Sequence, residues 1–241
     1  MAPPLVPRFH GSCVVVTGVG RPGQLGEVVA RVFGELGAAV HCVDRDAMVN
    51  DRVAELRAGG VNAVAHAADL TDFEAASRLA AQIAATNNGR VDVVAALAGG
   101  FAMSGPIAES DPTVYVRQIA ISLTSAYATA RAFLPGVRAA KGSFVFATST
   151  AALPGGRAAG MSAYAMAKGG LVQLVRALAQ EERDSGVRAN ALAPTALRTA
   201  ANLQSMGDSI RYVEREEFAA TLVSLCGPAF GRVTGQVLEL A

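Results

Sequence analysis

The sequence predicts an α/β fold with a single doubly wound parallel sheet of about seven strands and helices on both faces. Short apolar runs alternate with helical patterns along the whole chain, which favours parallel strands joined by helical crossovers. The apolar runs are continuous rather than alternating with polar residues, as expected for strands buried on both faces. The 241 residues also suffice for one domain with a sizeable core.

Four strands are predicted in the first part of the chain, over residues 12–18, 38–44, 61–69 and 91–100. Three helical patterns separate them. The first runs through Val28 to Leu36 and ends at Gly37, the second runs through Val53 and Leu56 and ends at Gly59 and Gly60, and the third covers about Asp72 to Thr86. Glycine at the end of a helical pattern is a typical stop signal.

A long helix is predicted from about Pro112 to Leu134, stopped by Pro135 and Gly136 because proline interrupts a helix. Strands over 142–149, 187–194 and 235–240 then alternate with helices over about 162–183 and 214–225. We expect the whole chain, 1–241, to be one domain. Residues 1–10, which are rich in proline, should form a loose arm. The poorly periodic residues 195–213 should form a lid over a ligand.

Composition excludes several classes of function. The formal net charge is +1 and no basic cluster occurs, so we expect no nucleic-acid partner. No apolar run reaches the ~20 residues of a membrane helix, and the N-terminus lacks a secretory signal, so we expect a cytoplasmic protein. The three cysteines have no metal-ligand spacing and should be free thiols. The three histidines are scattered, so we expect no metal site and structural roles for the histidines.

Tyr164 and Lys168 stand one helical turn apart in SAYAMAKGG. Residues at i and i+4 share a helix face, and a nearby ammonium favours the phenolate form of a tyrosine. Such a tyrosine can exchange a proton with a carbonyl or hydroxyl oxygen. The same spacing also occurs in ordinary helices with one half-buried tyrosine and one exposed lysine, so the surrounding residues must decide.

A glycine-rich turn follows the first predicted strand, with Gly18, Gly20, Gly23 and Gly26 before the helix begins. Glycines at this place let the backbone approach a pyrophosphate, which then sits at the helix N-terminus. A merely flexible turn is the alternative interpretation.

Two acidic residues end the next two strands. Asp44 could accept hydrogen bonds from the adenosine ribose hydroxyls and would repel a 2′-phosphate, which favours NAD over NADP. Arg21, in the glycine-rich turn, argues the other way because it could pair with that phosphate. Asp69 could meet the adenine amino group or cap the next helix, although Thr71 or Asp72 is better placed for the cap.

With these marks in this order, the chain resembles the short-chain dehydrogenase/reductase family from about Gly11 to Leu240. The resemblance rests on the segments TGVGRPGQLG, VDRD, ADLTD, GSFVFATS, YAMAK and VRANALAPT. It implies a Rossmann-like fold, a nicotinamide cofactor and hydride transfer between an alcohol and a ketone. It also implies a small-molecule substrate and a homodimer or homotetramer.

The resemblance also assigns roles to individual residues. Tyr164 would exchange the proton, Lys168 would lower its pKa and hold the nicotinamide ribose, Ser149 would steady the substrate oxygen, and Ser122 would take part in proton relay. The residues implied in cofactor binding are Gly18, Gly20, Arg21, Gly23, Leu25, Asp44, Asp69, Leu70, Ala98, Gly99, Tyr164, Lys168, Pro194, Thr195 and Thr199.

The chain departs from the family pattern in the glycine-rich turn and around it. The turn is two residues longer than usual and carries Pro22 where a glycine is expected. Its length matches the branch that contains bacterial enoyl reductases, with Leu25 in register. That branch has a tyrosine seven residues before the lysine, where this chain has Met161. Enoyl reduction is therefore disfavoured.

The other departures concern polar residues. The family's two asparagines after the fourth strand are Ala96 and Leu97 here, and Ser122 stands in place of the helix asparagine. Ser149 lies fifteen residues before Tyr164 rather than thirteen, so Thr148 and Thr150 are rival hydroxyls. The usual Asp-Gly-Gly tail is also missing, which puts in doubt the contact it makes across a tetramer interface.

We expect an NAD-preferring oxidoreductase acting on a secondary alcohol or ketone with an apolar body. The apolar pocket would come from Phe101, Met103, Leu153, Met161, Leu203 and Met206. Arg198 and Arg211 are expected on the surface, with contact to an anionic group as the alternative. A non-catalytic binding or scaffold protein is the alternative function. An extended-branch epimerase is a third, for which the chain after Pro194 leaves little room.

Overall fold

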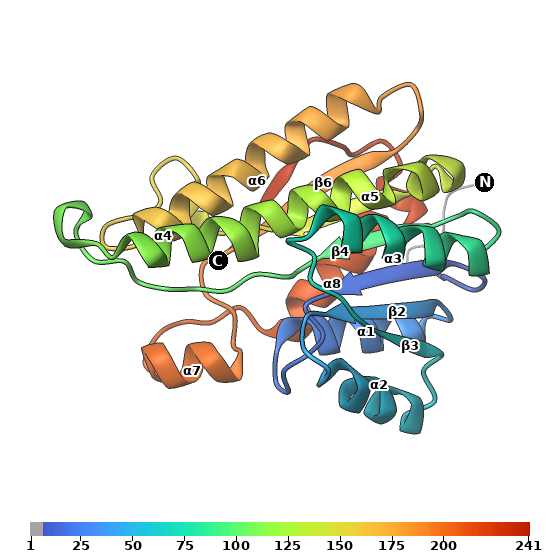
Figure 1. The fold of residues 1–241 in the computed structure, drawn as a ribbon, viewed down its shortest axis with the longest axis horizontal. Coiled ribbons are helices and arrows are strands. Elements are labelled where there is room, and N and C mark those ends of the chain that lie inside the picture. Colours follow the sequence, from blue (N-terminus) through green and yellow to red (C-terminus); the bar gives the residue numbers. More distant parts are fainter. Residues whose placement is uncertain (1–6) are drawn as a thin grey trace.

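The computed structural model describes residues 7–241, which fold around one seven-stranded parallel sheet (Figure 1). The strand order is β3-β2-β1-β4-β5-β6-β7, which confirms the predicted doubly wound sheet. The strands are β1 (Cys13–Thr17), β2 (Ala39–Asp44), β3 (Ala63–Ala67), β4 (Val93–Ala96), β5 (Ser143–Ala147), β6 (Arg188–Pro194) and β7 (Val237–Leu240).

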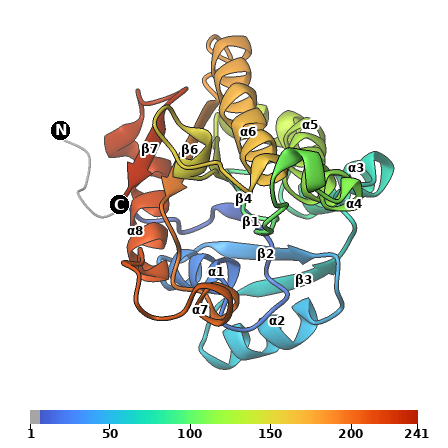
Figure 2. The ribbon, with the colours of Figure 1, turned by 90° about the vertical axis from the view of Figure 1, so that its left-hand side faces the viewer.

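Helices cover both faces of the sheet, as Figure 2 shows. One face carries α1 (Leu25–Glu35), α2 (Val49–Ala58) and α8 (Arg215–Cys226). The other carries α3 (Phe73–Thr86), α4 (Pro112–Gln118), α5 (Ser125–Ala140) and α6 (Ser162–Glu181). The short helix α7 (Ala200–Met206) lies beyond the end of the sheet, where the Ala200 amide donates to the Gly23 carbonyl at 3.2 Å.

The sheet divides the buried side chains into two cores. Successive residues of a strand point to opposite faces. In β1, Val14 and Val16 belong to the core under α1 and α8, while Val15 belongs to the core under α3 and α5. All three valines are fully buried. Burying each side chain contributes about 1.5–3 kcal/mol, which explains why these strands read as unbroken apolar runs.

The predicted stop at Pro135 is wrong. α4 leads through a π-helical segment (Ile119–Thr124) into α5, which contains Pro135 and ends at Ala140. A proline in a helix removes the hydrogen bond to the carbonyl four residues earlier. Here that residue is the exposed Arg131, so water can satisfy its carbonyl. Gly136 lets the helix lie close to Val91, because a Cβ there would be 3.1 Å from Val91 Cγ2.

Phe9, which was expected in a loose arm, is instead packed on the body of the protein. Its ring meets the Phe33 ring edge-on with 5.0 Å between centroids, and its amide donates to the Leu36 carbonyl at 2.9 Å. Residues 1–6 of the predicted arm lie outside the described part of the chain.

His41 on β2 and His66 on β3 form a polar contact in an otherwise apolar part of the sheet. His41 Nδ1 lies 3.0 Å from His66 Nε2, and the Asn87 side-chain amide lies 3.2 Å from His41 Nε2. Burial, with a smaller effect from His66, lowers the pKa of His41 to about 4. These contacts tie the end of α3 to the edge of the sheet, which is a structural role.

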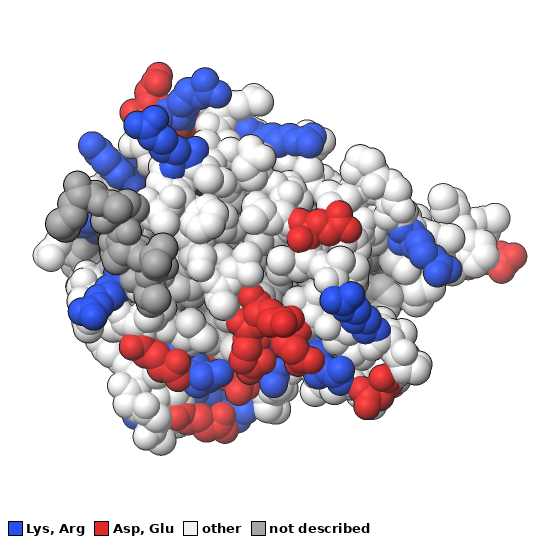
Figure 3. All heavy atoms as spheres, turned by 180° about the vertical axis from the view of Figure 1, so that it is seen from behind, with Lys and Arg blue, Asp and Glu red and all other residues white. Residues whose placement is uncertain are grey.

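The three thiols are unpaired, with Cys13 and Cys42 buried and Cys226 half-buried. Burial raises the pKa of both Cys13 and Cys42 to about 12. None of the helices between residues 7 and 241 has the length and apolar character needed to cross a bilayer. On the face in Figure 3, acidic and basic side chains are interspersed rather than gathered into a field of one sign.

Candidate functional site

A cleft of about 1110 Å³ opens at the carboxyl ends of the strands, the edge at which open α/β sheets bind ligands. It brings together most of the residues singled out from the sequence. The lining includes Gly18, Arg21, Leu25, Asp44, Asp69, Leu70, Ala98, Gly99, Ser149, Tyr164, Lys168, Pro194, Thr195 and Thr199. Gly20, Gly23 and Ser122 are not part of this lining.

Lys168 is buried in the floor of the cleft. Its ammonium donates to the Ala147 carbonyl at 2.7 Å and lies 5.9 Å from the centroid of the Tyr164 ring. Burial lowers the pKa of Lys168 to about 8. The lysine therefore stays mostly charged at neutral pH, and its charge faces the tyrosine from one helical turn away.

The pKa of Tyr164 is raised by burial, and contact with the Ser149 hydroxyl lowers it by less. The net direction is opposite to the lowering expected from a lysine neighbour. Burial is the larger cause, because the phenol is enclosed in the cleft beside Phe101. The two aromatic rings meet edge-on with 5.1 Å between centroids. Tyr164 therefore carries its proton at neutral pH.

Ser149 is better placed than its two rival hydroxyls. It is only 4% exposed, stands two residues after the end of β5, lines the cleft and contacts Tyr164. The Thr148 hydroxyl instead donates to the Lys168 backbone carbonyl at 2.8 Å, so it fixes α6 to β5. Thr150 also lines the cleft, but it begins the short 3-10 turn Thr150–Ala152 that follows Ser149.

Ser122 lies in the π-helical segment, behind Gly99. A Cβ at Gly99 would be 3.2 Å from Ser122 Oγ and 3.5 Å from Lys168 Nζ, so the hydroxyl and the ammonium face the same point. The Ser122 hydroxyl is fully buried and has no hydrogen-bond partner among the described residues.

The glycine-rich turn is packed too closely for side chains. A Cβ at Gly26 would be 2.3 Å from the Gly18 carbonyl oxygen, and Gly18 itself has φ 80° next to Ala98. Thr17 has a role here that no motif in the sequence indicated. Its Oγ1 accepts from the amides of Leu97 and Ala98, both at 3.0 Å, and thereby joins the ends of β1 and β4.

Asp44 is held directly over the glycine-rich turn. A Cβ at Gly20 would be 2.6 Å from the Asp44 carboxyl carbon, so only glycine at position 20 lets the carboxylate lie there. Gly23, the next glycine of the turn, packs instead toward α7, where a Cβ would meet the Ala200 methyl at 3.2 Å. Arg21 lines the same end of the cleft, and so does Arg45, which the sequence analysis did not consider.

Asp69 does not cap α3. Its carboxylate accepts from the Thr71 hydroxyl at 2.7 Å and the Thr71 amide at 2.9 Å, and these two bonds hold the pKa of Asp69 below its usual range. The cap is Asp72, which accepts from the amides of Glu74 and Ala75.

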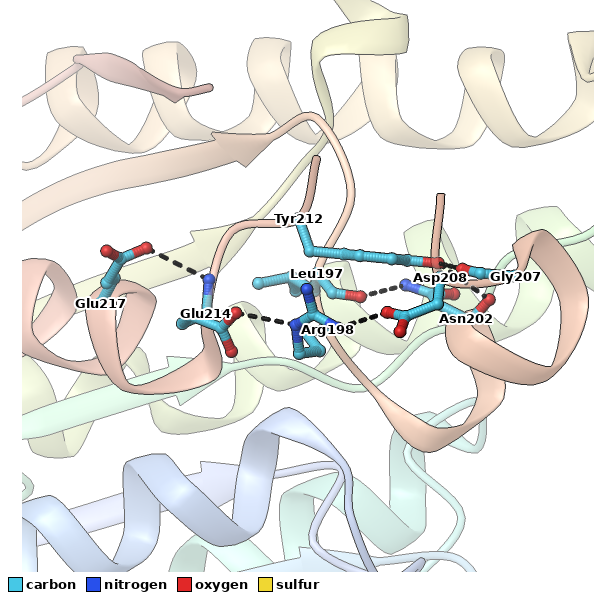
Figure 4. Close-up of polar contacts among 8 residues, drawn as sticks. All are labelled: Leu197, Arg198, Asn202, Gly207, Asp208, Tyr212, Glu214 and Glu217. Carbon is cyan, nitrogen blue, oxygen red and sulfur yellow. Dashed lines mark hydrogen bonds and ion pairs between the residues drawn. The ribbon is translucent and has the colours of Figure 1, made fainter. Parts of the chain in front are cut away.

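The segment 195–213 is cross-linked by its own side chains (Figure 4). Arg198 donates to Asp208 at 2.8 Å and to Glu214 at 2.7 Å, and its guanidinium lies 4.9 Å from the Tyr212 ring centroid. The Tyr212 hydroxyl donates to the Gly207 carbonyl at 2.6 Å. Thr199 caps α7 by accepting from the Asn202 amide at 3.2 Å. Arg198 is thus paired with Asp208 inside the segment and with Glu214 just beyond it, and it does not line the cleft.

Apolar side chains form the wall opposite the nucleotide end. Phe101, Leu153, Met161 and Met206 line the cleft. Met103 and Leu203, which were also expected there, are not part of the lining. The buried Gln118 also lines the cleft, although nothing in the sequence pattern indicated it.

Comparisons with known proteins agree with this geometry. The family model described as Enoyl-(Acyl carrier protein) reductase matches residues 18–240. The chain is 32% identical to galactitol 2-dehydrogenase (L-tagatose-forming) from Cereibacter sphaeroides, over 97% of this chain and 94% of the relative.

Two solved structures share the fold over nearly their whole length. One is assigned as an NAD(P)-dependent gluconate 5-dehydrogenase from Beutenbergia cavernae and holds NADP at low occupancy, with TM-score 0.86, 32% identity and 96% of each chain covered. The other is 7α-hydroxysteroid dehydrogenase with NADH and 7-oxo glycochenodeoxycholic acid, with TM-score 0.86 and 27% identity over 97% of this chain and 94% of that chain. The chain therefore belongs to the short-chain dehydrogenase/reductase family, and its relatives are oxidoreductases that act on alcohols and ketones.

Proposed function

We propose that the protein is an NAD-preferring oxidoreductase that acts on a secondary alcohol or ketone with an apolar body. The observation that carries the proposal is the grouping of Ser149, Tyr164 and Lys168 at the end of β5, in the same cleft as Asp44. When bound, the nicotinamide cofactor supplies or accepts the hydride. No observation favours the non-catalytic alternative.

The three side chains divide the work on the substrate oxygen. In the reductive direction, Tyr164 gives its proton to that oxygen, which its raised pKa permits at neutral pH. Ser149 donates a hydrogen bond to the same oxygen and stabilises the charge that develops on it. The buried charge of Lys168 stabilises the phenolate that remains. In the oxidative direction Tyr164 must first be a phenolate, which the charge of Lys168 would stabilise, and it would then accept the hydroxyl proton.

The preference for NAD rests on Asp44. Its carboxylate lies over the glycine-rich turn, where a ribose 2′-hydroxyl can donate to it and a 2′-phosphate is repelled. Arg21 and Arg45 line the same end of the cleft, where an arginine could pair with a 2′-phosphate and so favour NADP. The solved relatives include one with NADP and one with NADH.

We also propose the remaining cofactor contacts and the lid. Gly18, Leu25, Ala98 and Gly99 would flank the pyrophosphate and ribose, and Asp69 and Leu70 the adenine. Pro194, Thr195 and Thr199 would meet the nicotinamide end. The segment 195–213 would move over the cofactor, with Arg198 holding it together through Asp208 and joining it to the start of α8 through Glu214. We further propose a homo-oligomer that works in the cytoplasm.

Enoyl reduction is not part of the proposal, despite the description of the matching family model. Met161 occupies the position at which the enoyl-reducing branch carries its tyrosine. In the structure Met161 precedes α6 and lines the cleft. A thioether there cannot donate a proton as a phenol does.

Titration with NADH and, separately, NADPH tests the cofactor end, with Asp44→Ala and Tyr164→Phe alongside. We expect NADH to bind at least ~10-fold more tightly than NADPH, because one charge-assisted hydrogen bond contributes roughly 1.5–3 kcal/mol. Asp44→Ala should remove most of that preference. Equal binding of both nucleotides by the unchanged protein would contradict the assignment of Asp44.

Turnover is then screened with polyols, hydroxysteroids and hydroxy acids, since relatives act on such compounds. Tyr164→Phe should lose turnover while nucleotide binding remains measurable. Binding of nucleotide without turnover of any secondary alcohol or ketone would favour the scaffold alternative.

A further inference from the structure

Three buried side-chain polar atoms lack a hydrogen-bond partner among residues 7–241, and two of them lie beside the cleft. The three are Arg52 Nε, Gln118 Oε1 and Ser122 Oγ. A buried polar atom left unpaired costs about 1–3 kcal/mol, so native structures keep few of them. Gln118 and Ser122 stand four residues apart, which places them on one side of the helix. Two such atoms on one helix face suggest that they share a single partner.

Lys168 has hydrogen-bond donors that match the partner which these two oxygens lack. An ammonium has three N–H donors, and in the described chain one of them has a protein acceptor, the Ala147 carbonyl. The Ser122 hydroxyl and the Lys168 ammonium face the same point beside Gly99. Gln118 is 2% exposed, and it lines the cleft that Lys168 and Tyr164 also line. Unused acceptors and unused donors therefore lie around the same cleft.

The backbone has an irregularity at the same place. Residues Ile119–Thr124 form the π-helical segment that joins α4 to α5. Such segments are rare, and they occur frequently at functional sites. This one begins directly after Gln118 and contains Ser122. It therefore sets the spacing of the two polar groups beside the cleft.

We propose that Gln118 is a positioning residue which, together with Ser122, holds bound water against the Lys168 ammonium. The carboxamide and the hydroxyl would share the task that one asparagine side chain performs elsewhere. Water suits this site because it can donate to both unpaired oxygens and accept from the lysine. Gln118 acts through Lys168 and does not touch the substrate oxygen. The inference deepens the proposed function and rests on it for its catalytic meaning.

The chain has two lysines, Lys141 and Lys168, so the test needs no substrate. Lysine labelled with ¹³C at the ε-carbon gives two NMR signals, and the exposed Lys141 serves as an internal reference. In the unchanged protein the Lys168 signal should titrate near pH 8. Gln118→Met keeps the length of the side chain and removes the acceptor. It should lower the Lys168 pKa by about 0.5 or more, because an acceptor favours the charged form of the lysine.

Ser122→Ala should shift the signal in the same direction. The double variant should shift it by less than the sum of the two single shifts, since both groups act on the same water. Gln173→Met, on the exposed face of α6, is the matched control and should leave the titration unchanged. Gln118→Glu provides a second arm if Gln118→Met does not fold. Its carboxylate should raise the Lys168 pKa.

An unchanged Lys168 titration in folded Gln118→Met, or in folded Gln118→Glu, would overturn the inference. Failure of the proposed function would look different. Lys168 would titrate near pH 8 and shift in the variants as described, but the protein would bind no nicotinamide nucleotide. Once a substrate is known, Gln118→Met should also shift the pH profile of kcat/KM at unchanged nucleotide affinity. A merely structural residue would lower activity equally at every pH.

Discussion

Two neighbouring hydroxyls at the end of β5 have different partners, and their variants should behave differently. Ser149→Ala removes the donor to the substrate oxygen, so we expect kcat to fall by about 100-fold or more with little change in stability. Thr148→Val removes the bond to the Lys168 carbonyl, so it should cost roughly 1–2 kcal/mol of unfolding free energy. Steady-state kinetics and urea denaturation of both variants separate the two roles. A larger loss of kcat in Thr148→Val than in Ser149→Ala would reverse the assignment.

The contact between Gly20 and Asp44 should control cofactor affinity. A methyl at position 20 would lie 2.6 Å from the Asp44 carboxyl carbon, so Gly20→Ala must displace the carboxylate. We expect NADH to bind about 10-fold more weakly or worse, as for the loss of one charged hydrogen bond. Gly59→Ala in the remote α2 region is the control and should bind NADH normally. Unchanged NADH affinity in Gly20→Ala would show that Asp44 makes no contact with the cofactor.

The pairing of β2, β3 and α3 through His41 should make stability depend on pH. The pKa of His41 falls to about 4 in the folded protein, against about 6.5 when unfolded. Below pH 6.5 the unfolded chain therefore binds a proton that the folded chain rejects, and stability falls as the pH falls. Between pH 7 and pH 5 we expect a loss of roughly 2 kcal/mol. Urea denaturation at both values measures it, and His41→Leu should remove most of the dependence.

Element by element, the sequence was most informative where a single local pattern decides the structure. All seven strands were predicted because continuous apolar runs have few alternatives in an α/β chain. The end of α5 was not predicted, because the effect of Pro135 depends on whether water reaches the Arg131 carbonyl. The pairing of Arg198 with Asp208 and Glu214 also depends on tertiary folding of the segment 195–213. Gln118 could not be identified as a site residue from the sequence, because a glutamine in a helix is common and only its burial makes it distinctive.

For the whole molecule, we expect self-association through exposed apolar side chains on the helices of one face. Val116 on α4, Tyr127 on α5 and Met166 on α6 are 64%, 50% and 53% exposed. A second copy packed over these helices would bury them. Light scattering should show a dimer or tetramer, and Val116→Glu combined with Tyr127→Glu should shift it toward monomer. Met48→Glu, on the opposite face, should not. A monomeric unchanged protein at micromolar concentration would contradict this assembly.

The scarcity of lysine and the burial of Lys168 have a practical consequence for labelling. Amine-reactive reagents attack uncharged, accessible amines, and the side chain of Lys168 is only 6% exposed. The other lysine, Lys141, is exposed where α5 ends, just before β5 begins. That position is at the amino ends of the strands, and the cleft is at their carboxyl ends. A dye or surface linker coupled to a lysine side chain will therefore attach at Lys141, leaving the cleft unobstructed and facing away from the support.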